Sequence, residues 1–510
     1  MGKSRPSSLW PVALNAVTIS SSRLKMCASS ALSILSAAVL AACAAGPDYV
    51  PPELKLQDRY AAAQAPVTRA PGAEPLARTW WRGFNDPLLA ELVENALQQN
   101  LDIEQALARL SQSRAGLKAA SAALLPSVSV SGQAARSHLS TETPQGRLLS
   151  ATPNFDRNGS YYEADLNVAW ELDLFGGARR GRESAAASLQ ASVASVEAVR
   201  LAVAAQTADT YILIRGLQAR LAIAEDQTLT RARLVDLVRL QQSHGLAADL
   251  QVHQAQGTLA LAQATLPVLR SALEVACNSL DVALGVPPGT YRQRLMVRAA
   301  IPAAPALPSL GTPADLLRRR PDLLAAERNL AASNARIGVA VSGYYPKLSF
   351  GALLGTATTN SAHLLESPAD QASAFLGLRW RLFDFGRVDA EIVSAKGQAA
   401  QALAAYRLAA LRASEDVENA LSEQYSRAEQ ARVLAQGEVS LAKARQSAEA
   451  AYRSGVVSLV EVLDADDKLL ATMDARAQAQ AYSARAAVAS FKALGGGWEA
   501  PATASIASGP

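Results

Sequence analysis

Residues Trp170–Gly176 read Trp-Glu-Leu-Asp-Leu-Phe-Gly, and residues Trp380–Gly386 read Trp-Arg-Leu-Phe-Asp-Phe-Gly. Each stretch ends a segment that alternates like a strand and begins a long, Ala-rich segment of helical character. The second stretch follows the first by 210 positions, and Gly455 follows Gly245 by the same distance. Repetition at one offset indicates an internal duplication, so the chain is built from two strand-to-helix units.

Before the first stretch, apolar and polar residues alternate over a long segment. It exceeds the ~5–6 residues usual in globular sheets and fits the ~9–11 residues that cross a bilayer at a tilt. The pattern predicts a strand with one lipid-facing and one water-facing side; the alternative is an exposed strand of a sandwich. The apolar positions are Tyr162, Ala164, Leu166, Val168, Trp170, Leu172 and Leu174 in the first copy, and Leu348, Phe350, Ala352, Leu354, Ala372, Ala374, Leu376, Leu378, Trp380 and Leu382 in the second.

Long helices are predicted after both stretches. Residues 181–245 contain no Pro and a single internal Gly, Gly216, and at ~1.5 Å per residue such a helix is about 95 Å long. Residues 386–455 have a similar length, and returning helices should end near Gly285 and Gly495. Each copy is therefore a β-hairpin followed by a helical hairpin. Since four strands cannot close a lipid-facing barrel, membrane insertion would require several chains.

Composition limits the function classes. Of 510 residues, 50% are hydrophobic but only 5% are aromatic, as expected for Ala-rich helices that pack along their lengths. Without the four basic residues that precede position 43, 45 basic and 45 acidic residues remain, so there is no electrostatic case for nucleic-acid binding. Three cysteines (Cys27, Cys43 and Cys277) imply no disulfide framework, and the histidines show no ligand spacing. No metal or other cofactor is expected.

The N-terminus has the features of an export signal. The uncharged segment 26–42 follows Arg23 and Lys25 and ends in Leu-Ala-Ala before Cys43. This sequence resembles a bacterial lipobox, so diacylglycerol and palmitate are expected on Cys43, and Ala44 in place of Asp favours the outer membrane. The alternatives are an ordinary signal that contains a Cys, or a start at Met26, which would remove the basic region.

The duplication also predicts the segment boundaries. Asn85 or Asp86 can cap a helix that should run to about Leu125, and Asp322 can cap its counterpart in the second copy. The predicted segments are a signal peptide (1–42), an extended lipid-anchored tether (43–79), a first repeat (80–295) with a β-hairpin (127–176) and a helical hairpin (181–285), a Pro-rich linker (296–313), a second repeat (314–498) with a β-hairpin (347–386) and a helical hairpin (387–495), and a C-terminal tail (499–510).

Motifs along nearly the whole mature chain resemble those of the TolC-like outer-membrane efflux protein family, in particular its lipoprotein branch, which OprM typifies. They occur in the expected order. They are Gly46-Pro47-Asp48-Tyr49 after the lipobox, Trp80-Trp81-Arg82 with Phe84 and Asp86-Pro87, the stretch Trp170–Gly176, Arg319-Arg320-Pro321-Asp322 with Ala326-Glu327-Arg328, Ile337-Gly338-Val339-Ala340, Tyr345-Pro346, Phe383-Asp384 with Gly386-Arg387, Asp416-Val417-Glu418, and Leu494-Gly495-Gly496-Gly497-Trp498.

The resemblance implies an α+β membrane protein that forms a homotrimer. Its twelve-stranded transmembrane β-barrel would lie in the outer membrane and continue into a long periplasmic α-helical barrel. Such proteins are exit ducts of tripartite efflux pumps: they dock to a periplasmic adaptor protein and an inner-membrane RND-type transporter, and they pass drugs or toxic compounds to the exterior. The alternative within the family is the exit duct of a type I protein secretion system.

In this family, acidic residues on the helix tips close the periplasmic end. The matching residues are Tyr452, Glu461 and Asp464, and the i, i+3 spacing of the two carboxylates places them on one helix face. In a trimer they would form two rings that attract cations. Two departures matter: Val457 stands where some members carry a basic residue, and Glu461 replaces an Asp.

The first copy lacks these charges, because Gln251 and Gln254 occupy the equivalent positions. The gate would thus depend on the second copy alone. The alternative interpretation is that Glu461 and Asp464, together with their neighbours Asp466 and Asp467, form an ordinary solvated helix face.

The stretches Trp170–Gly176 and Trp380–Gly386 are then expected at the point where a lipid-facing strand ends and a helix of the tube begins. Trp170, Gly176, Trp380 and Gly386 would mark this strand-to-helix junction. The two tryptophans are either interfacial aromatics at the inner rim of the membrane or parts of a packed joint between barrel and helices.

Two other classes of protein fit less well. An enzyme is not expected, because the sequence contains no nucleophile elbow, zinc motif or phosphate loop. A structural lipoprotein that spans the periplasm as a coiled coil would account for the helices and the lipid, but not for four amphipathic strands.

Overall fold

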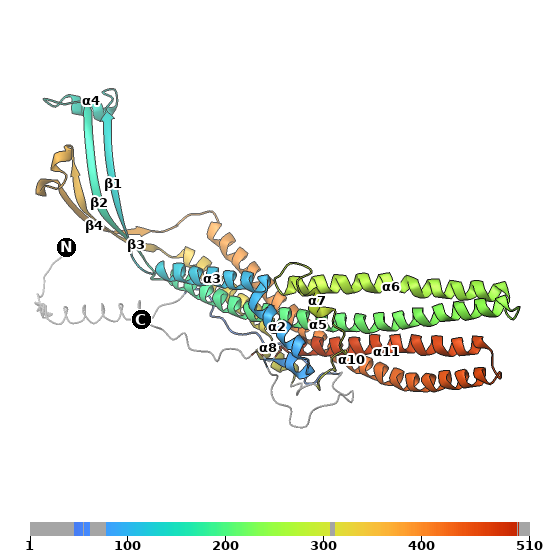
Figure 1. Cartoon of the computed structure of the whole chain (residues 1–510). Helices are drawn as coiled ribbons and strands as arrows, with labels where there is room; N and C mark the ends of the chain where they lie inside the picture. Colours follow the sequence, from blue (N-terminus) through green and yellow to red (C-terminus); the bar gives the residue numbers. More distant parts are fainter. Residues whose placement is uncertain (1–44, 55, 62–77, 307–311, 497, 499–510) are drawn as a thin grey trace, which may run out of the picture.

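The computed structural model describes residues 45–498 apart from residues 55, 62–77, 307–311 and 497. A four-stranded antiparallel sheet lies at one end, and long helices extend from it (Figure 1). The predicted signal peptide, Cys43, the C-terminal tail and parts of the tether and of the linker lie outside the described residues.

The sheet contains the two predicted β-hairpins in chain order, and β2 pairs with β3 to join the two copies. Trp170 is directly opposite Phe350 in this pairing. The strands end earlier than predicted, so Leu174, Trp380 and Leu382 lie beyond them, and the first hairpin loop contains an unpredicted helix, α4 (Pro144–Ser150). The strands are β1 (Ser127–His138), β2 (Asn158–Leu172), β3 (Lys347–Thr358) and β4 (Asp370–Arg379).

The two long helices, α5 and α10, have 67 residues each, and at ~1.5 Å per residue each is about 100 Å long. Both begin directly after the Gly of the opening stretches: α10 starts at Arg387, as predicted, and α5 starts at Gly177, four residues before the predicted start at residue 181. The helices are η2 (Trp80–Phe84), α2 (Pro87–Gln99), α3 (Leu101–Ala122), α5 (Gly177–Ser243), α6 (Asp249–Ala283), α7 (Arg292–Leu295), α8 (Pro313–Arg319), α9 (Pro321–Val341), η3 (Ser342–Tyr344), η4 (Ser361–His363), η5 (Ser367–Ala369), α10 (Arg387–Arg453) and α11 (Leu459–Ala493).

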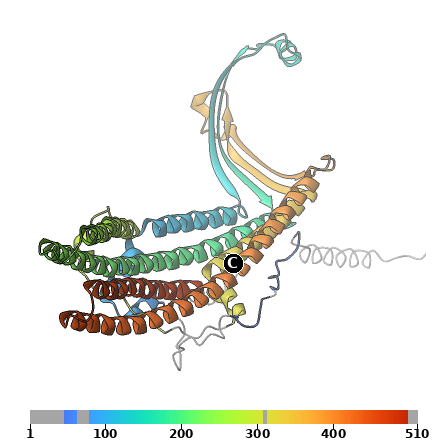
Figure 2. The same ribbon diagram turned by 90° about the vertical axis from the view of Figure 1, so that its right-hand side faces the viewer.

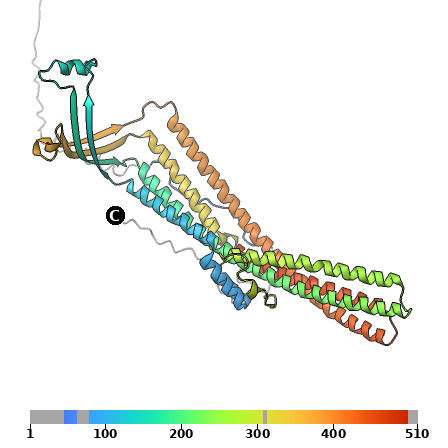
Figure 3. The ribbon, with the colours of Figure 1, turned by 45° about the horizontal axis from the view of Figure 1, so that its top comes forward.

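The helices form a curved layer. Away from the sheet, the order across the layer is α6, α5, α11, α10, so α6 and α10 form its two flanks (Figures 1 and 2). Near the sheet the order is α3, α5, α9, α10 (Figure 3). The sheet likewise ends in two unpaired edges, β1 and β4. One chain therefore builds a curved wall with two open sides.

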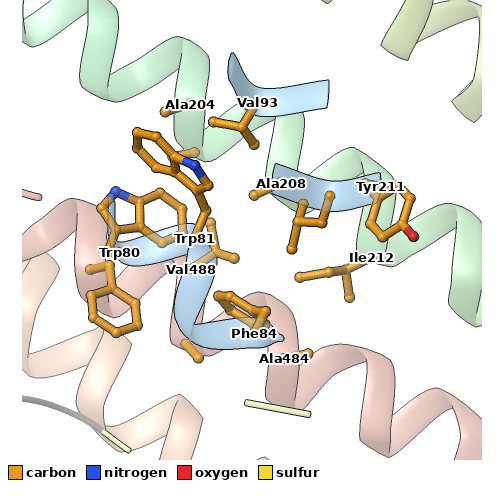
Figure 4. Packing of buried hydrophobic residues seen from close by; sticks show 14 of the residues in the cluster. Trp80, Trp81, Phe84, Val93, Ala204, Ala208, Tyr211, Ile212, Ala484 and Val488 are labelled. Carbon is orange, nitrogen blue, oxygen red and sulfur yellow. The ribbon is translucent and has the colours of Figure 1, made fainter. Parts of the chain in front are cut away.

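The main core lies where the helical hairpins begin. Trp80, Trp81 and Phe84 from η2 are buried against α5 and α11 (Figure 4). The Trp80 ring stacks on Phe491 of α11, with 5.3 Å between the ring centroids. The tryptophan pair of the sequence motif thus attaches the N-terminal helices to both copies.

Two details of the helix prediction were wrong. Asp86 does cap α2, but the helix predicted to reach Leu125 breaks at Asn100. The Asn100 backbone is extended and its side chain accepts hydrogen bonds from the first turn of α3, so it ends one helix and begins the next. Asp322 does not cap α9. Pro321 takes the first helical position, which makes Arg320 the cap residue, and Asp322 forms an ion pair with it.

Candidate functional site

The predicted gate residues lie at the free tip of the second helical hairpin, α10 and α11, far from the sheet and beside the tip of the first hairpin. Gly245 and Gly455 make equivalent turns there with φ values of 75° and 76°, which only Gly adopts readily. The long helices therefore reverse at matching places in both copies. Tyr452 precedes the second turn, and Glu461 and Asp464 follow it.

Glu461 and Asp464 both have local partners. A Glu461 carboxylate oxygen accepts hydrogen bonds from the Ser458 backbone N–H at 2.5 Å and from its hydroxyl at 2.8 Å, which is a capping box. Asp464 forms an ion pair with Lys468 at 2.6 Å, and both of these side chains are exposed. Both carboxylates thus remain accessible, but Glu461 also serves as a structural cap, which the spacing alone did not predict.

Tyr452 lies between the two hairpins rather than on the outer face. Gln241, at the end of α5, donates a hydrogen bond from Nε2 to the Tyr452 hydroxyl at 3.3 Å. Both residues line a cavity of about 450 Å³ between the hairpins, together with Gln251 and Gln254 of the first copy. The tip of each protomer is therefore held partly by polar contacts between its two copies.

The two neighbouring acidic residues both pair with arginines, although the Asp467 side chain remains 46% exposed. Asp466 is buried, and one of its oxygens lies 2.8 Å from Arg445 Nε. Burial raises the pKa of the Asp466 carboxyl; Asp467 and Glu449 raise it further, and Arg445 opposes the shift. Asp467 lies 2.5 Å from Arg231 of the other hairpin. Sequence reasoning missed this last pair, because recognising it requires knowing which faces of α5 and α11 meet.

The contact between Asp467 and Arg231 is one of a series along α5 and α11. Each pair lies 2.5–2.8 Å apart at its closest atoms and joins the first copy to the second. Such partly exposed pairs contribute ~0.2–1 kcal/mol each. Together they favour the observed spacing of the two hairpins, but they are too weak to prevent the hairpins from separating. The pairs are Asp209–Arg485, Arg220–Asp474 and Arg231–Asp467.

At the other end, the predicted junction residues form two matching joints. Trp170 Nε1 donates a hydrogen bond to the Leu124 carbonyl at 3.0 Å, and Trp380 Nε1 donates to the Tyr344 carbonyl at 2.9 Å. Each indole thus ties the end of a strand to the end of the helix that precedes the hairpin. Both rings stay partly exposed. The hydrogen bonds of the two indole N–H groups agree with a packed joint between barrel and helices. The rings are partly exposed, so they can also lie at the membrane interface.

Gly176 and Gly386 are the residues that let the chain turn from strand to helix. They are the cap positions of α5 and α10, with φ values of 80° and 83°. An aspartate supplies the capping oxygens in each copy: Asp173 accepts from the N–H groups of α5, and Asp384 from those of Gly386 and α10. The repeated motif thus encodes an indole anchor, an aspartate cap and a left-handed glycine.

The predicted lipidation residue, Cys43, lies outside the described residues, but the chain that follows it is placed. The Ala45 N–H donates to the Phe175 carbonyl at 3.1 Å, and Arg180 donates to the Ala45 carbonyl at 3.1 Å. Gly46 is packed so closely against Gly338 that a Cβ would lie 2.5 Å from its Cα. The segment that begins at Ala45 is therefore fixed beside the strand-to-helix junction.

Comparison with known proteins agrees with this architecture. Residues 92–286 and 312–496, which fall in the two copies, match the family described as outer membrane efflux protein. The pyoverdine export outer membrane protein OpmQ of Pseudomonas putida is 33% identical over 440 residues, covering 86% of this chain and 92% of OpmQ. Nodulation protein T of Rhizobium leguminosarum bv. trifolii is 30% identical over 469 residues, covering 92% of this chain and 97% of its own length.

Solved structures show the same fold. The outer-membrane channel OprN superposes with a TM-score of 0.79 at 33% identity, covering 89% of this chain and 99% of OprN. The CmeC outer membrane channel of Campylobacter jejuni superposes with a TM-score of 0.81 at 21% identity, covering 90% of this chain and 96% of CmeC. The chain therefore belongs to the outer membrane efflux protein family.

Proposed function

We propose that three copies of this chain close a twelve-stranded barrel in the outer membrane, continued by a helical tube in the periplasm. The supporting observation is the pair of open sheet edges, β1 and β4. Backbone groups inside a bilayer must find partners, and one chain leaves two rows of them unpaired. A ring of identical chains satisfies both edges at once, because β4 of one copy can pair with β1 of the next.

The proposed role of this tube is the exit duct of a tripartite efflux pump. The partners would be a periplasmic adaptor protein, which contacts the helical tube, and an inner-membrane RND-type transporter. Among relatives, one is named for pyoverdine export and others for antibiotic and toluene efflux. Small molecules are therefore the preferred substrate class over secreted proteins.

Measuring accumulation tests this role. A strain that lacks the gene should accumulate more of one or more probes from a panel of fluorescent small molecules than its parent, and the wild-type gene on a plasmid should reverse this. Deleting the partner transporter alone should give the same increase. Equal accumulation of every probe in all strains, with loss of a secreted protein instead, would favour the secretion duct.

The lipid on Cys43 is a second part of the proposal. Its support is the position of Ala45, which is hydrogen-bonded beside the junction where the strands meet the helices. A lipid two residues earlier would enter the inner leaflet next to the proposed barrel. Radioactive palmitate should label the wild-type protein and not the Cys43→Ala variant, whereas persistent labelling of the variant would refute the assignment.

The proposed gate consists of the three copies of Glu461 and Asp464 around the axis. Both side chains are exposed at the tip, and neither is buried by its own protomer. Rings of carboxylates at a constriction favour cations. The selectivity of the channel is therefore expected to depend on these two positions.

A further inference from the structure

Another cavity lies away from the tip, where the first helical hairpin meets the short helix α7 (Figure 1). It is lined by residues of α5, of α6 and of the segment 292–298, which leads into the predicted Pro-rich linker. Its volume is about 280 Å³, just below the ~300–1,000 Å³ that is typical of small-molecule sites. The size of the cavity therefore suits a small molecule.

The most buried part of the cavity wall is largely apolar. Leu221 of α5 lines it together with Leu273 and Cys277 of α6, and all three side chains are buried. Met296 lies at the edge of the cavity and is 49% exposed. Covering apolar surface releases ~25 cal/mol per Å², so this part of the wall favours a ligand with a hydrocarbon part.

The more exposed part of the wall is charged, with an excess of positive groups. Among the described residues, three arginines and two glutamates line it: Arg270, Arg292, Arg298, Glu225 and Glu274. Arg292 pairs with Glu274. Glu225 is shared, because one of its oxygens lies 2.5 Å from Arg298 and the other lies 3.5 Å from Arg270. Of these five charges, one positive charge therefore has no negative counterpart, and Arg270 is the most weakly neutralised arginine.

The segment that carries two of these arginines is fixed against α5. Arg215 donates a hydrogen bond from Nη1 to the Val297 carbonyl, and Gln218 donates from Nε2 to the Leu295 carbonyl, both at 2.6 Å. The two donor side chains are buried, and so is the side chain of Leu295. The wall of the cavity is thus ordered before a ligand binds, which lowers the entropic cost of binding.

The second copy indicates that the helical hairpin does not require this set of side chains. Its two helices have the same lengths as those of the first copy, 67 and 35 residues. At the offset of 210, however, small or uncharged residues replace the lining residues of the cavity: Ala435 for Glu225, Gln480 for Arg270, Ala484 for Glu274 and Ala487 for Cys277. The charged cavity is therefore a specific feature of the first copy.

We propose that this cavity is a binding site for a small organic carboxylate that carries a compact hydrocarbon part. The carboxylate meets Arg270 and Arg298, because a guanidinium binds a carboxylate through two parallel hydrogen bonds. The hydrocarbon part covers Leu221 and Leu273. The site goes beyond the proposed duct and does not depend on the trimer, because all of its residues belong to one chain.

Calorimetric titration of the full-length protein in lipid nanodiscs with 4-ethylbenzoate tests the site. One ligand should bind per chain, and the binding should be saturable. The neutral analogue 4-ethylbenzamide should bind at least tenfold more weakly, because it has the same shape but no charge for the arginines. Equal affinities for the two compounds, or no saturable binding of 4-ethylbenzoate, would overturn the proposal.

Two substitutions with opposite effects locate the ligand. Arg270→Gln should weaken the binding of 4-ethylbenzoate at least fivefold. Glu225→Gln should strengthen it at least threefold, because it removes the carboxylate that competes for Arg270 and Arg298. The matched control is Arg239→Gln, which removes an exposed arginine of α5 outside the cavity and should leave the affinity unchanged. Equal losses in both arginine variants, or no gain for Glu225→Gln, would contradict the assigned contacts.

Cys277 reports independently on the position of the ligand. Its thiol is buried, and burial raises its pKa, so we expect a slow reaction with iodoacetamide. Mass spectrometry of the peptide that contains Cys277 measures the rate. Saturating 4-ethylbenzoate should slow the reaction at least fivefold, and the same concentration should protect less in Arg270→Gln. An unchanged rate with the ligand bound would place the ligand elsewhere and overturn the proposal.

Discussion

At the scale of single residues, Glu461 illustrates how one side chain can serve both the local fold and the channel. Its carboxylate accepts two hydrogen bonds from Ser458 and so caps α11, yet the side chain remains exposed at the tip. Glutamine can still accept in a capping box but has no charge, whereas alanine can do neither. The two roles can therefore be separated by substitution.

Glu461→Gln combined with Asp464→Asn should lower the cation selectivity of the channel in planar bilayers without changing thermal stability. Glu461→Ala should also lose the cap, which costs ~0.5–2 kcal/mol and should lower the melting temperature. Reversal potentials in a salt gradient report the selectivity. An unchanged reversal potential in the double variant would remove these residues from the gate.

Gly386 gives a cleaner test of backbone strain. Its φ of 83° is left-handed, and a Cβ there would meet no atom within 4 Å, so only the backbone conformation resists substitution. Gly386→Ala should cost ~1–2 kcal/mol, and Gly386→Asn should cost less because Asn tolerates this region. Thermal unfolding of the two variants provides the comparison, and equal melting temperatures would contradict the strain argument.

At the scale of elements, the sequence predicted the long helices and the hairpins well, because their periodicity extends over many residues. The prediction from sequence failed where a single side chain determines the local structure. Asn100 breaks a helix through its own hydrogen bonds, and nothing in the apolar pattern around it changes at that point. Asp467 was missed as a link between hairpins because its partner, Arg231, is 236 positions away. Such pairs become visible only in three dimensions.

Asn100 should therefore be sensitive to replacement. Its Oδ1 caps α3, and its Nδ2 donates to the end of α6 at 2.9 Å. Asn100→Ala loses both contacts and should destabilise the protein by ~1–2 kcal/mol, whereas Asn100→Asp keeps the capping acceptor and should lose less. Chemical denaturation of the purified variants in detergent measures the difference. Equal losses would mean that the cap contributes nothing.

The ion pairs between the hairpins should resist opening of the tip. Arg231→Gln removes the pair closest to the tip, and Arg231→Lys keeps the charge as a control. Loss of one such pair is worth ~0.2–1 kcal/mol, which corresponds to roughly a 1.4- to 5-fold shift in an open–closed equilibrium. The fraction of time that single channels spend in high-conductance states should rise for Arg231→Gln and should stay unchanged for Arg231→Lys. No change for Gln would place the barrier to opening elsewhere.

At the scale of the whole molecule, the protein is an outer-membrane efflux channel component whose single chain is structurally incomplete. Its sheet has two open edges, its helical layer has two open flanks, and α6 leaves an aliphatic stripe exposed. Burying each such side chain is worth ~1.5–3 kcal/mol, so assembly should contribute much of the stability of the folded protein.

Native mass spectrometry of the full-length protein, extracted from outer membranes in mild detergent, tests the assembly most directly. The account predicts particles of three chains that resist detergent and separate into single chains only on heating. A population of single chains that remain folded in detergent before heating, with no particles of three, would contradict it.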